Sequence, residues 1–142
     1  MSASAIADGI ITIFTAASPF GAQHVTKNNY ALMETSACAI VVQSIRNQTA
    51  PYAYGRNGQW KDSRTFFLDC WLKETGNPQS DLNNLLTFQD DVEYVLRNND
   101  TLNDTARGIS EIRMERDPEA VWVYGGQQWF RLFCEVDCWE LA

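Results

Sequence analysis

The clearest pattern in the chain is a long alternating run near its C-terminal end. Between Gln128 and Trp139 every second residue is apolar, and these are Phe130, Leu132, Cys134, Val136 and Cys138. Successive side chains of a strand point to opposite faces, so this pattern predicts a β-strand with one face toward a core. Such a strand needs partner strands and a second layer that covers its apolar face.

Four other segments have the alternation or composition of strands. Arg64–Lys73 alternates between an apolar and a mixed face. Thr35–Ile45 is rich in β-branched residues, and its centre is apolar on both faces, which favours an interior strand. Gly108–Arg116 alternates as well, and Ala120–Tyr124 reads as a short extended piece.

Apolar residues recur at helical spacing in two segments. Ala3–Ala16 carries isoleucines three and four positions apart, and Ser18-Pro19 ends this helix because proline disfavours helical backbone in the residue before it. A second helix begins after Ser80, a good N-cap, and ends near Arg97. Phe20–Glu34 shows little periodicity and is expected to be a connection.

These elements define a fold class. Their order and the short links between the later strands predict an α+β fold, with a mostly antiparallel four- to five-stranded sheet and two helices packed on one face. The 142 residues suit a single domain, residues 1–142, and leave no room for two independent cores.

The polar link 46–62 is expected to project from the body as a long hairpin loop. Asn57-Gly58 is a strong turn signal, and the segments around it suit two short strands. Links of this length are usually functional, and the alternative is an ill-ordered surface hairpin. We expect this link to contact a neighbouring chain through Tyr52, Tyr54, Arg56, Trp60 and Lys61.

The charge balance disfavours several kinds of partner. Eleven Lys and Arg residues face eighteen Asp and Glu residues, for a formal charge of −7, and the cations are scattered. Nucleic-acid binders need clustered cations, so we expect no direct binding to nucleic acid or to an anionic membrane. The apolar stretch Ala3–Ala17 is too short for a membrane span and lacks the basic residues of a secretion signal. The acidity either keeps the protein soluble or repels DNA.

Four cysteines, Cys38, Cys70, Cys134 and Cys138, all fall in predicted strands. Cys134 and Cys138 share a face but stand about 13 Å apart, too far for a disulfide or a shared metal. We therefore expect buried free thiols in a reducing cytoplasm and no metal site, with a disulfide as the weaker alternative.

Few residues suggest catalysis. A Ser-His or Cys-His nucleophile would need His24, the only histidine, which lies in the irregular connection. Glu135 and Asp137 point the same way about 7 Å apart, a separation that suits an inverting glycosidase. The favoured alternative is a solvated face neutralised by Arg113 and Arg131. We expect no enzyme, no catalytic residue and no cofactor, with a small enzyme as the minor alternative.

Aromatic residues are more numerous on the sheet than one covered face requires. Five of them are predicted on the face away from the helices, namely Phe67, Trp71, Trp129, Phe133 and Trp139. Either a loop of the same chain or another subunit must cover these rings. The second interpretation, which we favour, makes them interface residues of a self-assembling protein.

The layout of nearly the whole chain resembles that of tail-terminator (tail-completion) proteins of long-tailed bacteriophages. The segments concerned are the helix Ala3–Ala16, the strand Cys38–Ile45, the loop Arg46–Asp62, the strand Arg64–Lys73, the helix Asp81–Arg97 and the final run Trp129–Asp137. Such proteins form a hexameric ring that caps the tail tube and docks to the head-side neck. The resemblance implies a structural protein of the virion tail or neck, assembled in the host cytoplasm, with itself, tail-tube and neck proteins as partners.

Two further expectations follow from the resemblance. Exiting DNA would pass through the ring without being bound, and the candidates to line its channel are Glu111, Glu115, Glu135 and Asp137, unless they pair with Arg113 and Arg131. Head-completion stoppers and tail-tube subunits have comparable layouts, so another neck or tail component is the next alternative, and a cellular binding module comes after it.

Overall fold

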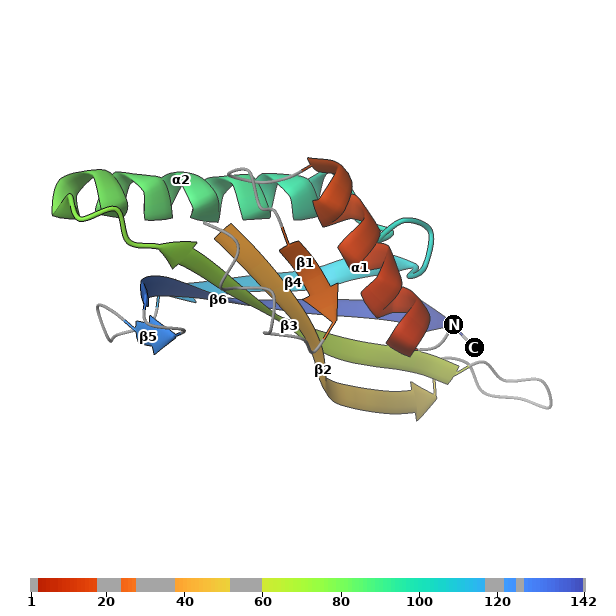
Figure 1. Cartoon of the computed structure of the whole chain (residues 1–142). Coiled ribbons are helices and arrows are strands. Elements are labelled where there is room, and N and C mark those ends of the chain that lie inside the picture. Colours follow the sequence, from red (N-terminus) through yellow and green to blue (C-terminus); the bar gives the residue numbers. More distant parts are fainter. Residues whose placement is uncertain are drawn as a thin grey trace.

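The computed structural model describes residues 3–17, 24–27, 38–51, 60–116, 122–124 and 127–141. These residues form two helices and six strands (Figure 1). The elements are α1 (Ala3–Ala17), β1 (His24–Lys27), β2 (Cys38–Pro51), β3 (Trp60–Lys73), α2 (Pro78–Arg97), β4 (Gly108–Arg116), β5 (Trp122–Tyr124) and β6 (Gln127–Leu141).

The strands form one six-stranded sheet, which confirms the α+β class. The sheet is mixed, because the mostly antiparallel arrangement that was expected includes one parallel pair and one more strand than predicted. The order is β1-β2-β3-β6-β4, with β5 paired to β6. All neighbouring pairs are antiparallel except β1 and β2, which are parallel. The segment predicted as a plain connection therefore contains a strand. Four residues are too few to show a period, and β1 is defined by its pairing with Ala39–Val42, the apolar interior part of β2.

The main core joins one register of the sheet to both helices. The alternating residues predicted to point inward are buried there, including Phe66, Leu68 and Cys70 of β3 and Leu132, Cys134 and Val136 of β6. They meet residues of α1 such as Ile10 and Phe14 and residues of α2 such as Phe88 and Val92. In Figure 1 α2 lies above the sheet ribbon, and α1 descends at the right to the level of the strands.

Helix α2 begins earlier than predicted. Pro78 occupies its first turn, and the N-cap is Asn77, whose side chain accepts a hydrogen bond from the Ser80 backbone N–H at 3.2 Å. Ser80 is therefore inside the helix and is not the cap, because proline at the first helical position fixes the backbone one turn earlier. Asp81 is buried and accepts hydrogen bonds from the backbone N–H and hydroxyl of Thr75, at 3.0 and 2.6 Å.

The turn after α2 packs closely against α1. Leu102, Asn103 and Asp104 all have positive φ, and the side chain of Leu102 is fully buried. A methyl group at Gly9 would collide with the Leu102 backbone oxygen and would lie 2.7 Å from the Thr105 hydroxyl oxygen. Glycine at position 9 therefore allows the turn to approach the helix.

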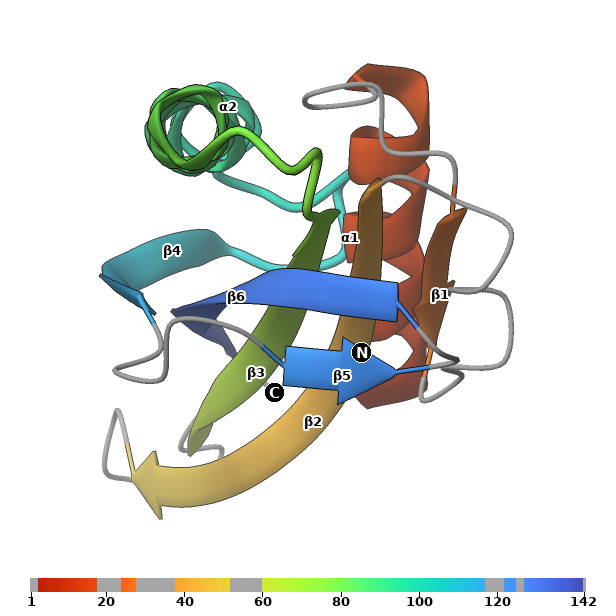
Figure 2. The ribbon, with the colours of Figure 1, turned by 60° about the vertical axis from the view of Figure 1, so that its left-hand side comes forward.

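Strands β2 and β3 extend further than the sequence predicts. Their antiparallel pairing continues past a bulge between Ser44 and Arg46 and ends at Pro51↔Trp60. Much of the polar link is thus strand, and Figure 2 shows this part of the hairpin curving away from the helices. Residues 52–59, which include the predicted interface residues Tyr52, Tyr54 and Arg56, lie outside the described part of the chain.

Candidate interaction surface

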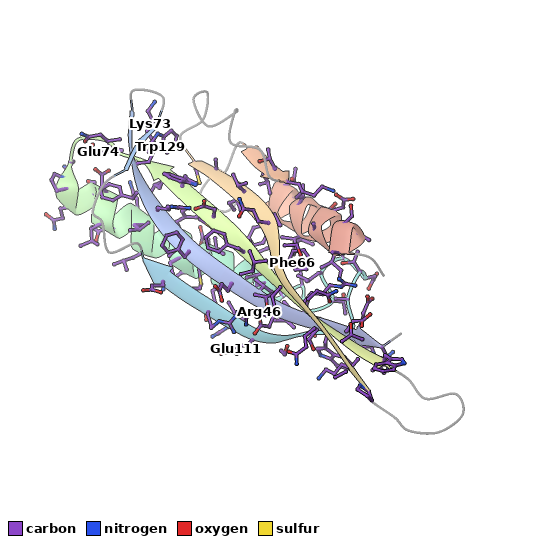
Figure 3. All side chains as sticks on the ribbon, turned by 90° about the horizontal axis from the view of Figure 1, so that it is seen from below. Arg46, Phe66, Lys73, Glu74, Glu111 and Trp129 are labelled. Atoms are coloured by element: carbon purple, nitrogen blue, oxygen red, sulfur yellow. The ribbon has the colours of Figure 1, made fainter. Side chains whose placement is uncertain are left out.

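The candidate surface is built on the sheet face that bears the other register, which we call the outer face. Figure 3 views the molecule from this side. The residues of this register include Ala39 and Val41 of β2, Thr65, Phe67, Asp69 and Trp71 of β3, Trp129, Arg131, Phe133, Glu135 and Asp137 of β6, and Glu111, Arg113 and Glu115 of β4.

A buried ion pair organises one half of the outer face. The Arg131 guanidinium donates two hydrogen bonds to the Asp69 carboxylate, at 2.7 and 2.6 Å. The same guanidinium lies 4.8 Å from the ring centre of Trp71 and 4.7 Å from that of Phe133. Phe133 in turn packs on Phe67, with ring centres 5.5 Å apart. These contacts order the ring-bearing surface within a single chain.

Two of the predicted interface tryptophans are already buried by their own chain. Trp71 is 6% exposed and Trp129 is fully buried. Strand β5 pairs with β6 at this end of the sheet, in the register Trp122↔Trp129. Both side chains are therefore buried within the single chain, and an interface with another subunit has to use other side chains. Phe133 and Trp139 remain partly exposed.

A cluster of charges occupies the other half of the outer face, with Arg113 at its centre. Its guanidinium donates hydrogen bonds to Asp137 at 2.6 and 3.0 Å, to Glu135 at 2.8 and 3.1 Å and to Glu111 at 2.9 Å. The Thr65 hydroxyl donates to Asp137 at 2.6 Å. Hydrogen bonding by Arg113, opposed by desolvation and supported by Thr65, lowers the pKa of Asp137.

The ion pairs show how the acidic residues expected to line a channel are paired within the chain. Glu111, Glu135 and Asp137 pair with Arg113, whereas Arg131 pairs with Asp69. Glu115 is exposed. Three carboxylates around one guanidinium still leave an excess of negative charge on this surface. An acid catalyst needs a raised pKa, and the pKa of Asp137 is shifted in the opposite direction.

The extension of the β2–β3 hairpin is largely exposed. We call residues 44–51 of β2 with residues 60–64 of β3 the arm. Residues 44–51 are all exposed, and the large apolar side chains of Ile45 and Trp60 are 47% and 50% exposed. Next to Trp60, the Lys61 ammonium lies 5.0 Å from the centre of the Trp139 ring.

Two hollows flank the first half of β4. One, of about 350 Å³, lies between the end of α2 and β4 and is lined by Glu93, Leu96, Arg97, Asp100 and residues 109–112. The other, of about 280 Å³, lies between the arm and β4 and is lined by Arg46, Gln48, Ser63, Arg64, Thr65, Ser110, Glu111 and Asp137. Figure 3 shows Arg46 and Glu111 on this side of the sheet, from β2 and β4.

The cysteines confirm the expectation of buried free thiols. All four are free and buried. Burial raises the pKa of Cys38, Cys134 and Cys138 to about 12 and that of Cys70 well above its usual value. Among the residues whose positions are described, no group of three potential ligands could hold a metal ion, and no helix is long and apolar enough to cross a membrane.

No protein-family model matches the chain, and no curated protein is significantly similar to it in sequence.

Proposed function

We propose that this protein is a ring-forming tail-terminator subunit, a structural protein that caps the tail tube of a long-tailed bacteriophage and joins it to the head-side neck. The proposal rests on the resemblance in layout stated above. The observation that carries it is the arm, a regular hairpin with Ile45 and Trp60 exposed beyond the core. An exposed aromatic and an exposed aliphatic side chain on a paired hairpin suit a subunit contact better than a solvent-facing role.

In this proposal each subunit has two helices as a layer over one face of its sheet. The hairpin that contains residues 46–62 projects toward the next subunit. The acidic surface of Glu111, Glu115, Glu135 and Asp137 faces the channel. Negative charge in excess there repels the phosphate backbone, so a passing duplex does not stick.

Energetically, the contact depends on apolar area more than on charge. At roughly 25 cal/mol per Å² of buried apolar surface, the Trp60 ring contributes more than one screened surface charge. Lys61 lies next to Trp60 in sequence and is partly covered by Trp139, which makes it a matched control. Replacing Trp60 by Ala should therefore weaken assembly more than replacing Lys61 by Ala.

The test is sedimentation velocity of the wild type, Trp60→Ala and Lys61→Ala over a range of protein concentrations, with electron microscopy of the wild-type peak. We expect closed rings for the wild type, mostly monomers for Trp60→Ala and rings for Lys61→Ala. A wild type that remains monomeric at every concentration contradicts the proposal. If the wild type forms rings and Trp60→Ala sediments in the same way as the wild type, the role given to the arm is wrong.

A further inference from the structure

Strand β4 is an open edge of the sheet. It is the last strand in the sheet order, and in the described part of the chain it pairs only with β6. An edge strand presents alternate backbone N–H and C=O groups to any further strand, and proteins often block such edges with proline or a bulge. β4 contains no proline. Its pairing with β6 has a register shift between Ile109 and Glu111, near the start of the strand. Arg113 turns its guanidinium back toward β6 and so does not block the edge.

The arm has the second open edge. β1 pairs only with Ala39–Val42, so in the described residues the β2 segment 44–51 has a strand partner on one side, β3, and none on the other. At this end of the sheet the strand order is therefore β2-β3-β6-β4, with β2 and β4 as the two edges. Pairing these edges within one chain would close a four-stranded barrel, smaller than the five-stranded barrels of known small folds. A hollow of about 280 Å³ also separates the arm from the start of β4.

Charge and apolar groups complement one another between the arm and the α2–β4 groove, the hollow of about 350 Å³. In the arm, Arg46 is the charged residue of the β2 segment 44–51, and β3 carries Lys61, Asp62 and Arg64, of which Arg64 lies 3.9 Å from the Glu140 carboxylate. The groove is lined by Ile109 and Ile112, by the fully buried Leu96, and by Glu93, Arg97, Asp100 and Glu111. Glu93 pairs with Arg97, and Glu111 pairs with Arg113. Arg46 and the exposed side chain of Ile45 complement Asp100 and the two isoleucines of this groove, and a second copy of this chain supplies such a strand.

We propose that the open edge of the arm, residues 44–50 of β2, adds as a further strand to β4 of a second copy of this chain, alongside the α2–β4 groove. The contact is head-to-tail, because each copy uses the arm on one side and β4 on the other. Head-to-tail contacts form a ring when the rotation closes and a fibre when it does not. This inference rests on the proposed function, since a ring of identical subunits needs a contact of this type.

The test combines cross-linking with a charge probe. Asn47 is exposed on the arm and is replaced by the photo-cross-linker benzoylphenylalanine, and this copy is mixed with ¹⁵N-labelled wild type. We expect cross-links to labelled peptides from residues 93–116. As the charge probe, Ser110→Lys places a cation in the groove where Arg46 of the second copy would lie. It should weaken association about tenfold, whereas Thr87→Lys, the same change at an exposed position that does not line the groove, should leave association unchanged.

The outcomes separate this contact from the proposed function. Oligomers that cross-link elsewhere, or that respond equally to Ser110→Lys and Thr87→Lys, overturn the contact and leave the ring in place. Open chains or dimers that cross-link through the arm and β4 support the contact and contradict the ring. A protein with no oligomer under any condition contradicts both.

Discussion

Arg131 on β6 holds the fully buried carboxylate of Asp69 on the neighbouring strand β3 through two parallel hydrogen bonds, at 2.7 and 2.6 Å. The two residues are diagonal neighbours, because Asp69 lies opposite Phe133 and Trp71 lies opposite Arg131. Trp71 and Phe133 both lie near the guanidinium. A slip of one position in the β3–β6 register would separate the charges and turn every core residue of one strand outward.

Removal of one charge of this pair should destabilise the fold strongly. Asp69→Ala leaves the Arg131 guanidinium, which is only 20% exposed, without its carboxylate. We expect a loss of about 3 kcal/mol in the free energy of unfolding, as for other partly buried pairs. Urea denaturation checks this, with Glu115→Ala, an exposed carboxylate on the same face, as the control. Equal denaturation midpoints for the two variants would refute the structural role of the pair.

Gly9→Ala should destabilise the protein, although alanine favours helix. In an open helix the change would add about 1 kcal/mol of stability. Here the new methyl group meets the Leu102 backbone oxygen and Thr105, and overpacking of this kind costs about 1–3 kcal/mol. Thermal unfolding of the variant gives the sign directly. A raised melting temperature would show that the turn at Leu102 does not pack on α1 as described.

The free energy of unfolding should depend on pH in the acid range because Asp137 titrates there. Its pKa is lower in the folded state than in the unfolded chain, chiefly because Arg113 hydrogen-bonds the ionised form. This contribution is fully present above the unfolded pKa of about 4 and is lost as the pH falls through the lower folded pKa. The difference in unfolding free energy between the wild type and Asp137→Asn should therefore shrink from about pH 6 to about pH 2. A difference that stays constant over this range would argue against the shift.

The four thiols should be unreactive in the native protein. Burial raises their pKa values, and the thiolate is the species that reacts with disulfide reagents. We expect little reaction with Ellman's reagent at pH 8 in the native state and four rapid equivalents, the full cysteine count, after unfolding in denaturant without reductant. Fewer than four equivalents in denaturant would indicate a disulfide, and rapid native reaction would indicate an exposed thiol.

The protein should not bind duplex DNA. Its net charge is −7, and the carboxylates around Arg113 leave a negative surface. Electrostatic binding is strongest at low salt, so a filter-binding assay at about 50 mM salt is the most sensitive condition. Oligomerisation should hold steady or strengthen with salt, because repulsion between like-charged subunits is screened beyond about 8 Å at 0.15 M. A salt-sensitive DNA complex would contradict the channel role of the acidic residues.

Most of the core could be predicted because its apolar residues recur in the sequence with the period of a strand or a helix. The alternation of β3 and β6 and the spacing of α1 and α2 identified the side chains that meet in the core. Strand β1 could not be found this way, because four residues carry no period and its place depends on a partner strand. The length of the arm was also missed, since its polar residues gain strand geometry from the Thr49–Asp62 and Lys61↔Leu141 pairings and not from burial.

The candidate surface was predictable in part. Arg113 and its carboxylates stand on the outward register of β4 and β6, so their pairing could be anticipated from the sequence. Asp69 was missed as the partner of Arg131, although a carboxylate in the middle of a largely apolar strand was the signal available. Sequence alternation gives the face of Trp71 and Trp129 but not what covers them, so it left open whether the same chain or another subunit buries the two rings.

The mass of the purified protein in solution tests the central claim most directly. Size-exclusion chromatography with multi-angle light scattering, at protein concentrations from micromolar to near millimolar, gives this mass without reference to shape. We expect a species near six times the 16.1 kDa chain mass, and we expect Trp60→Ala to shift it toward the monomer. A single species of 16.1 kDa at every concentration would contradict the ring.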